Sequence, residues 1–181
     1  YKTSIVLCTA TQPSLDNFFG QIEKFVELCP RMEEQFEFFR RVTYQNIGNI
    51  SKENMAERLK KEQRALCIVN TRKRAQELYQ LLKSEGVYHL STTMYPKHRK
   101  KVLANVKERL DNKDRCILIA TSLVEAGVDL DFLSVYRQIA GIDSLIQAAG
   151  RCNRNGNEST EESKVYIYCL LYTSDAADDR I

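Results

Sequence analysis

Two arginines in the last third of this 181-residue chain have the residue type and spacing for phosphate chemistry. They belong to the segment Gln147-Ala-Ala-Gly150-Arg151-Cys-Asn-Arg154, which keeps the spacing Q-x-x-G-R-x-x-R after a predicted strand. Arginine is always charged, and its planar guanidinium can bind two phosphate oxygens at once. We expect a short helix that ends at Gly150, with both arginines projecting from the same turn. They could then stabilise the charge on a γ-phosphate during phosphoryl transfer, as arginine fingers do. An isolated pair would be read as surface arginines, but the added Gln147 and Gly150 favour phosphate chemistry.

A second segment follows the apolar run Cys116-Ile-Leu-Ile-Ala120. Thr121 stands at the end of this predicted strand, where its hydroxyl would suit a phosphate, and Asp129 would suit a ribose hydroxyl. Gly127 lets the backbone approach a ligand closely. For Thr121 or Asp129 alone, an ordinary loop with capping side chains remains an alternative.

Two further pairs of polar residues also follow predicted strands. Thr9 and Thr11 leave the apolar run at 5–8, and Asn70 and Thr71 leave the run at 65–69. Such residues are usually caps or turns. Small polar residues at a helix start can also bind a backbone phosphate through N–H donors, so both readings stay open.

The hydrophobic pattern predicts the scaffold that carries these residues. The continuous apolar run at 5–8 predicts a strand buried on both faces. Further strands are predicted at 42–44, 65–69, 87–90, 115–120, 135–139 and 164–170. Helical periodicity predicts helices, at 51–63, at 71–83 with Gly86 as the stop, from Pro96 with Val102, Leu103, Val106 and Leu110 inward, and at 143–150. This alternation predicts an α/β fold with a parallel sheet and helices on both faces. Ligands are then expected at the carboxyl ends of the strands.

A basic face is expected on the helix that begins at Pro96. Lys97, Lys100 and Lys101 share one side at the spacing i, i+3, i+4, and Lys107 lies two turns on. A solvated surface is the usual reading of such a face. A path for a single-strand backbone is an equally good reading beside the segments described above.

Composition limits the class of protein but does not identify it. The net charge of +3, from 27 basic and 24 acidic residues, is too small to indicate nucleic-acid binding alone. Six cysteines without C-x-x-C spacing and only two histidines argue against a zinc site and fit a reducing, cytoplasmic setting. No apolar run reaches the roughly 20 residues of a membrane span, so no membrane partner is expected.

In chain order the four segments resemble motifs III, IV, V and VI of superfamily 2 helicases. A narrower resemblance, from about Ile5 to Leu170, is to the CRISPR-associated helicase-nucleases of type I interference systems. Three stretches carry it: His89-Leu-Ser-Thr-Thr-Met-Tyr-Pro-Lys-His98-Arg99, Ser-Leu-Val-Glu-Ala-Gly-Val-Asp-Leu-Asp131, and Gln-Ala-Ala-Gly-Arg-Cys-Asn-Arg-Asn-Gly156. Many superfamily 2 members carry arginine where Ala148 stands, so Ala148 receives no ligand role.

The resemblance implies a role for each site residue. γ-Phosphate sensing falls to Gln147, Arg151 and Arg154. Nucleotide binding, including the ribose, falls to Gly127, Asp129 and Gly150. Contact with the nucleic-acid strand falls to Asn70, Thr71, Thr121 and the basic face. Coupling of hydrolysis to movement falls to Thr9 and Thr11. No metal ligand is assigned, since no phosphate-binding G-x-x-x-x-G-K-[ST] loop or Mg²⁺ motif occurs in the sequence.

The resemblance also implies a domain plan. Residues 1–41 are expected to be the last part of a first RecA-like domain and its connection, and 42–170 the second RecA-like domain. Residues 171–181 resemble a non-native tail, with a native acidic tail as the alternative. The chain begins without methionine, almost in an apolar strand, so we expect the phosphate cradle and the ligands of Mg²⁺ to lie upstream.

The function expected from the resemblance is ATP-dependent movement on single-stranded DNA in antiviral defence, with ATP and Mg²⁺ as cofactors. A CRISPR RNA-guided surveillance complex is the expected partner, and a prokaryotic cytoplasm the expected location. Alone, the chain is expected to be inactive. Two alternatives remain: another superfamily 2 DNA or RNA helicase, and a nucleic-acid-binding module without catalysis. Retention of both Arg151 and Arg154 argues against the latter.

Overall fold

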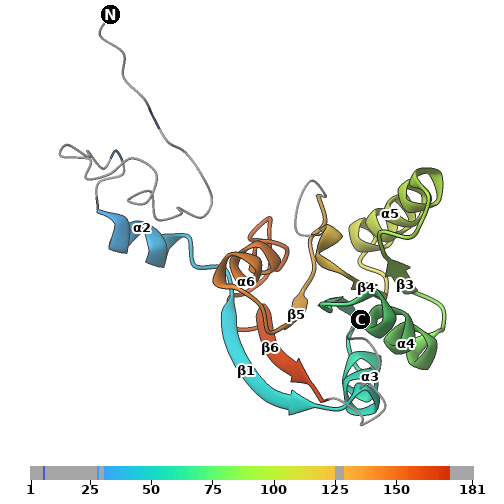
Figure 1. The fold of residues 1–181 in the computed structure, drawn as a ribbon. Coiled ribbons are helices and arrows are strands. Elements are labelled where there is room, and N and C mark those ends of the chain that lie inside the picture. The colour runs from blue at the N-terminus through green and yellow to red at the C-terminus, as the bar shows by residue number, and fades with distance from the viewer. Residues whose placement is uncertain (1–5, 7–27, 29–30, 125–128, 172–181) are drawn as a thin grey trace, which may run out of the picture. The chain divides into compact units, whose positions relative to one another are not determined.

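A computed structural model describes residues 6, 28, 31–124 and 129–171, in two units that divide between Arg40 and Arg41 (Figure 1). In the first unit the described residues form one helix, α2 (Met32–Phe38). Of the strand predicted at 5–8, only Val6 is described; its side chain is 66% exposed and it is not in a strand. Val6 is therefore not buried as expected, and the other residues of that predicted strand lie outside the described residues.

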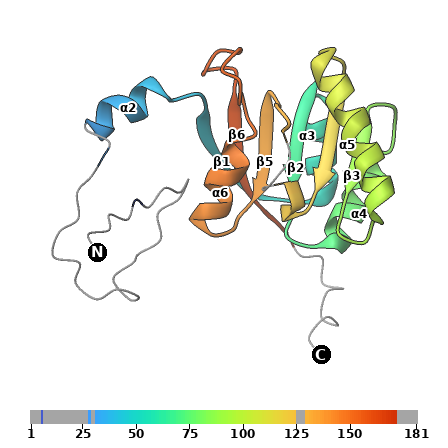
Figure 2. The ribbon, with the colours of Figure 1, turned by 90° about the horizontal axis from the view of Figure 1, so that it is seen from above.

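The second unit is built on a six-stranded parallel sheet in the order β1-β6-β5-β2-β4-β3. Figure 2 shows these strands side by side between the helices. The strands are β1 (Thr43–Ile50), β2 (Arg64–Ile68), β3 (Val87–Leu90), β4 (Cys116–Ala120), β5 (Ser134–Gln138) and β6 (Lys164–Leu170). The helices are α3 (Lys52–Lys60), α4 (Arg72–Leu82), α5 (Pro96–Asp111) and α6 (Ile142–Ala149), with a short 3-10 turn η1 (Ser122–Val124) after β4. The predicted parallel sheet is confirmed.

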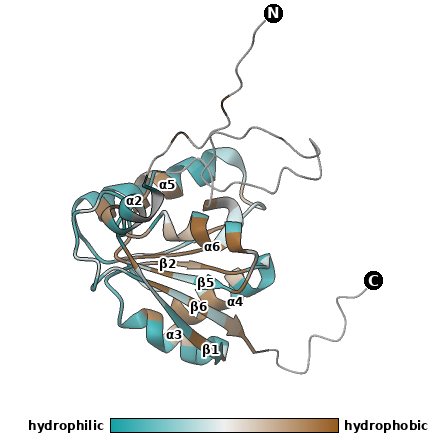
Figure 3. Ribbon diagram, turned by 90° about the vertical axis from the view of Figure 1, so that its left-hand side faces the viewer, coloured by the Kyte–Doolittle hydropathy of each residue, from teal (hydrophilic) through white to brown (hydrophobic). Residues whose placement is uncertain are grey.

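Helices cover both faces of the sheet, as the alternating pattern predicts. Helices α5 and α6 pack on one face, through Val102, Val106, Leu110, Ala148 and Ala149. Helices α3 and α4 pack on the other, through Met55, Ala56, Leu59, Ala75, Leu78 and Leu82. Figure 3 shows brown, apolar stretches in the sheet, such as β2, between helices whose outward sides are largely teal. Since every residue of β4 and β5 is buried, these strands hold the site rigidly from within.

Two helix starts are fixed by hydroxyl caps. Ser51 accepts a hydrogen bond from the backbone N–H of Asn54 at 3.2 Å, and α3 begins there as predicted. Thr71 accepts one from the N–H of Arg74 at 3.4 Å and begins α4. Pro96 occupies the first turn of α5, where its missing N–H costs nothing.

The predicted role of Gly86 as the stop of α4 is wrong. The helix ends at Leu82, four residues earlier, and α3 likewise ends at Lys60, short of the predicted residue 63. Gly86 instead opens β3 with φ +78°, and a Cβ placed there would lie 2.5 Å from the carbonyl oxygen of Arg115. The glycine is thus required by the close approach of two backbone segments.

In the part of the chain that the structure describes, no helix has the length and apolar character to cross a membrane.

Candidate functional site

The residues predicted to contact the nucleic-acid strand meet at the carboxyl edge of the sheet. Asn70 and Thr71 follow β2, and Thr121 follows β4, the neighbouring strand. Asn70 and Thr71 are exposed, whereas Thr121 is 7% exposed. The parallel topology therefore brings Thr121 to the same edge as Asn70 and Thr71, although it lies about 50 residues later in the sequence.

Asn70 is hydrogen-bonded to the end of β5 by three of its polar groups. Its backbone N–H donates to Gln138 Oε1 at 2.9 Å, and its Nδ2 donates to the carbonyl oxygen of Ile139 at 2.9 Å. Its Oδ1 accepts from Arg137 Nη1 at 2.7 Å. Asn70 therefore ties β2 to β5 beside Thr71. Sequence reasoning missed Arg137 and Gln138, because both lie inside an otherwise apolar strand.

Arg151 is buried against η1, the short turn that follows β4. Only 8% of the residue is exposed, and its Nε donates to the carbonyl oxygen of Val124 at 3.1 Å. Burial lowers the pKa of Arg151, the nearby cation Arg154 lowers it further, and the carboxylate of Asp129 opposes the shift. Since an arginine stays protonated well above neutral pH, Arg151 remains a cation here.

Arg154 is much more open than Arg151. Its Nε lies 2.8 Å from Asp129 Oδ1, with 42% of the arginine side chain and 75% of the aspartate side chain exposed. Asp131 holds the local backbone, because its two oxygens accept from the N–H groups of Arg154 at 2.7 Å and Asn155 at 3.2 Å. The carbonyl oxygen of Arg154 accepts from Arg41 Nη1. Its guanidinium is therefore accessible on a fixed backbone.

The two arginines do not project from one helical turn, which corrects the prediction. Helix α6 ends at Ala149, and the chain then turns through Asn153, whose φ is +46°. Asn153 fixes this turn by donating through Nδ2 to the carbonyl oxygens of Arg41 at 3.1 Å and Glu158 at 2.7 Å. The turn directs one arginine inward and leaves the other in solvent.

Two other residues predicted to bind the nucleotide, Gln147 and Gly150, belong to α6 and its end. Gln147 is exposed on α6, and Ala148 is buried in the core, consistent with its having no ligand role. Gly150 ends α6 as predicted, with φ −63°. A Cβ at Gly150 would meet nothing closer than 3.4 Å, so the fold itself does not require glycine. Thr9, Thr11 and Gly127 lie outside the described residues.

A groove of about 470 Å³ lies at the amino edge of the sheet, opposite Thr71 and Thr121. Asp129 and Asp131 line it, together with Arg64 at the start of β2. The β4–β5 connection has thus returned to the starts of the strands where it carries Asp129 and Asp131, whereas the sequence placed Asp129 among ligand-binding residues at the strand ends. Within the described residues, no group of three or more histidine, cysteine or acidic side chains is arranged to hold a metal ion.

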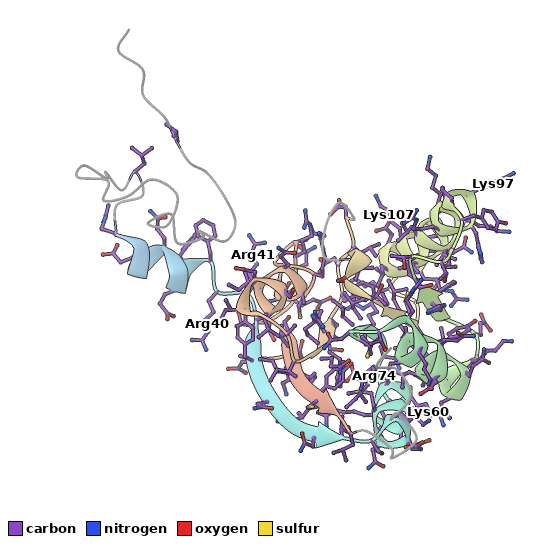
Figure 4. The ribbon with its side chains drawn as sticks, viewed as in Figure 1. Arg40, Arg41, Lys60, Arg74, Lys97 and Lys107 are labelled. Atoms are coloured by element: carbon purple, nitrogen blue, oxygen red, sulfur yellow. The ribbon has the colours of Figure 1, made fainter. Side chains whose placement is uncertain are left out.

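The predicted basic face is exposed along α5. Lys97, Lys100 and Lys101 face solvent, while Val102 and Val106 on the other side of the helix are buried. None of these three lysines has an ion-pair partner among the described residues. Figure 4 shows Lys97 and Lys107 projecting from the helix. The face therefore carries uncompensated positive charge.

Comparison with known families gives a match over more than half of the chain. A family model described as the C-terminal part of the CRISPR-associated nuclease/helicase Cas3 matches residues 61–157. The matched range includes Asn70, Thr71, Thr121 and Arg154.

Among the curated proteins that are similar in sequence, two are named CRISPR-associated nuclease/helicase Cas3. That of Methanothermobacter thermautotrophicus is 34% identical over 110 residues, 60% of this chain and 12% of that protein. That of Haloferax volcanii is 46% identical over 54 residues, 30% of this chain and 6% of that protein. The chain therefore spans only a small part of the length of these relatives.

Many solved structures are similar in fold, and two of them illustrate the likeness. The T. fusca Cas3–ATP crystal structure has a TM-score of 0.62 at 20% identity, covering 74% of this chain and 18% of that one. A CRISPR RNA-guided surveillance complex in a pre-nicking state contains a chain with a TM-score of 0.58 at 23% identity, covering 74% of this chain and 19% of that one. The RecA-like α/β fold predicted from the sequence is thereby confirmed.

Proposed function

The chain belongs to the family of C-terminal domains of the CRISPR-associated nuclease/helicase Cas3, and on this premise we propose that it is the second RecA-like half of an ATP-dependent DNA translocase. Its first 41 residues would then connect it to the first half. The observation that carries the proposal is the pairing of two accessible features on one rigid sheet. These are the half-exposed guanidinium of Arg154 beside Asp129, and the unpaired lysines of α5.

The nucleic-acid side of the proposal rests on the carboxyl edge and on α5. Thr71 and Thr121 would donate their hydroxyls to strand phosphates, with Asn70 holding the edge in place. Lys97, Lys100 and Lys101 would neutralise further phosphates, and release of the counterions would drive binding. Single-stranded DNA is the partner we propose, within a CRISPR RNA-guided complex like the one that contains a similar chain.

The nucleotide side of the proposal rests on Arg154 and Asp129. The pair fits ATP, because a half-exposed guanidinium can reach a phosphate and an exposed carboxylate can accept from a ribose hydroxyl. ATP with Mg²⁺ would supply the energy of phosphoryl transfer. Arg154 would stabilise charge on the γ-phosphate, and the buried Arg151 would add positive potential behind it. Gln147, Gly127 and Gly150 would line the same nucleotide, and Thr9 and Thr11 would couple its turnover to movement.

The setting we propose is the cytoplasm of a prokaryotic cell. Four cysteines in the described residues, Cys67, Cys116, Cys152 and Cys169, are free thiols, which suits a reducing compartment.

A binding assay on the chain itself tests the nucleic-acid side. We expect fluorescence anisotropy to show binding of single-stranded DNA, with an affinity that falls as salt rises. The double variant Lys100→Gln/Lys101→Gln should weaken binding and flatten the dependence of log K on log salt by about 0.7 for each phosphate that is no longer neutralised. Lys60→Gln/Lys61→Gln is the control that removes the same charge, since both are exposed lysines at the end of α3, on the opposite face of the sheet. If the control on α3 weakens DNA binding as much as the variant on α5 does, the α5 face has no particular role in binding.

A further inference from the structure

An exposed pair of aromatic rings stands at the start of α5, beside the basic face. The side chain of Tyr95 is 65% exposed, and its ring centroid lies 5.7 Å from that of His98, with the ring planes inclined at 43°. Tyr95 makes no side-chain hydrogen bond that caps the helix. Neither helix capping nor core packing therefore accounts for this tyrosine.

The backbone presents Tyr95 from a fixed position. Ser91 and Thr93, just after β3, share a hydrogen bond between their hydroxyls at 2.8 Å, and Met94 N–H donates to the carbonyl oxygen of Ser91 at 3.2 Å. Met94 packs against the core under α5. The first helical bond of α5 then runs from Arg99 N–H to the carbonyl oxygen of Tyr95 at 3.1 Å. A ring held between an anchored turn and a helix loses little freedom when a ligand stacks on it.

The charge around these rings indicates what kind of ligand they fit. Lys97 lies between the two aromatic residues in sequence, directly before His98 and two residues after Tyr95. Lys101 lies one helical turn after His98, so cations lie close to the pair. Figure 4 shows Lys97 projecting from this end of α5. An apolar protein partner would have to leave these charges unpaired. A single strand of nucleic acid matches both features, since its phosphates meet lysines while its bases stack on aromatic rings.

We propose that Tyr95, supported by His98, is a stacking platform for an unpaired base of the single-stranded DNA bound along α5. The inference rests on the proposed function, because it concerns the same strand, but it adds contact with a base to contacts with phosphates. Stacking on a ring depends little on which base is present. The platform would therefore hold the strand in register without selecting a sequence.

Two oligonucleotides of equal charge separate base contact from phosphate contact. One is a short oligothymidylate, and the other is an abasic strand with the same number of phosphates. We expect the chain to bind the oligothymidylate more tightly, and Tyr95→Ala to weaken that binding by about fivefold or more, as loss of one stacked base does. Binding of the abasic strand should not change. Tyr95→Phe should keep the wild-type preference, because it retains the ring.

Tyr44→Ala is the matched control. Tyr44 is a comparably exposed tyrosine, at 56%, on β1 at the opposite end of the sheet order from β3. The platform is refuted if Tyr95→Ala binds oligothymidylate as the wild type does, if it loses the abasic strand equally, or if Tyr44→Ala has the same effect. Failure of the unaltered chain to bind either strand would instead refute the nucleic-acid function itself, and the platform with it.

Discussion

The Nε atom of Arg154 lies 2.8 Å from the Oδ1 atom of Asp129, so the residue predicted to sense a phosphate is paired with the residue predicted to bind a ribose. The two residues are 25 positions apart in sequence and meet because the β4–β5 connection passes beside the turn after α6. If both bind a nucleotide, the ion pair must loosen or rearrange as the nucleotide arrives. Such a pair should therefore contribute little to the stability of the fold.

The first prediction follows from the exposure of this pair. An exposed ion pair is worth at most about 1 kcal/mol, so Asp129→Asn should change the free energy of unfolding in urea by less than that. Asp131→Ala is the comparison, because Asp131 accepts two backbone N–H groups. Loss of those charged acceptors should cost about 1–3 kcal/mol. A larger loss in Asp129→Asn than in Asp131→Ala would make the Arg154 pair structural.

The second prediction concerns Arg154 in catalysis. The test uses a chimera in which residues 42–170 of this chain replace the corresponding segment of the Methanothermobacter relative. The chimera must first be shown to hydrolyse ATP. Arg154→Lys keeps the charge but loses the planar fork. We expect ATP turnover to fall by about 10³ or more, as on removal of an arginine finger. Affinity for single-stranded DNA without ATP should barely change. The opposite pattern, reduced DNA affinity with surviving turnover, would make Arg154 a strand contact.

The third prediction is a loss of stability in acid through Glu158. Glu158 Oε1 lies 2.8 Å from Arg64 Nη2, with both side chains largely covered, and Arg64 lowers the pKa of Glu158 below its ordinary value of 4.5. A carboxylate with a lowered pKa stabilises the fold above that ordinary value, and the contribution is lost as pH falls through the folded-state pKa. Unfolding experiments across pH should show that Glu158→Gln is less stable than wild type at neutral pH and that the two converge below pH 4.5.

Glu57→Gln is the control for this acid effect. Lys60 also lowers the pKa of Glu57, but both side chains are exposed in solvent. A pH dependence as strong in Glu57→Gln as in Glu158→Gln would show that Arg64 is not the cause.

The fourth prediction concerns the turn into β3. Gly86 has φ +78° and approaches the backbone of Arg115, so alanine there is strained and also clashes. We expect Gly86→Ala to destabilise the chain by at least about 1–3 kcal/mol, the cost of a left-handed non-glycine residue. Gly141→Ala is the control, because a Cβ at Gly141 has nothing within 4 Å and φ is negative. Thermal or urea midpoints that fall equally in both variants would contradict this account.

Sequence patterns predicted the scaffold well because burial imposes them directly. The strands predicted at 87–90 and 164–170 have the bounds of β3 and β6, and the apolar residues predicted to face inward on α5 are largely buried. The direction of Arg151 could not be predicted, because it depends on the turn at Asn153 and on a carbonyl oxygen 27 residues away. Pairings such as Asn70 with Arg137 were equally hidden, since they arise only when β2 and β5 lie side by side.

The last prediction concerns whether Asn70 contacts single-stranded DNA itself or positions the residues that do. Its Nδ2 and Oδ1 atoms are both engaged, by the carbonyl oxygen of Ile139 and by Arg137, which is 3% exposed. Asn70→Ala leaves the Ile139 carbonyl without this donor and the Arg137 guanidinium without this acceptor, which should cost about 1–3 kcal/mol of stability.

A strand contact would have a different signature from this structural loss. If Asn70 only positions the edge, Asn70→Ala should keep nearly full affinity for single-stranded DNA at a temperature where it is fully folded. Thr71→Ala should then be the more damaging variant for binding, because the exposed Thr71 hydroxyl can still donate to a phosphate while it caps α4. Anisotropy titrations of both variants, with folding checked by circular dichroism, decide between the two. A fully folded Asn70→Ala that binds more weakly than Thr71→Ala would mean that Asn70 leaves Ile139 and Arg137 to reach the strand itself.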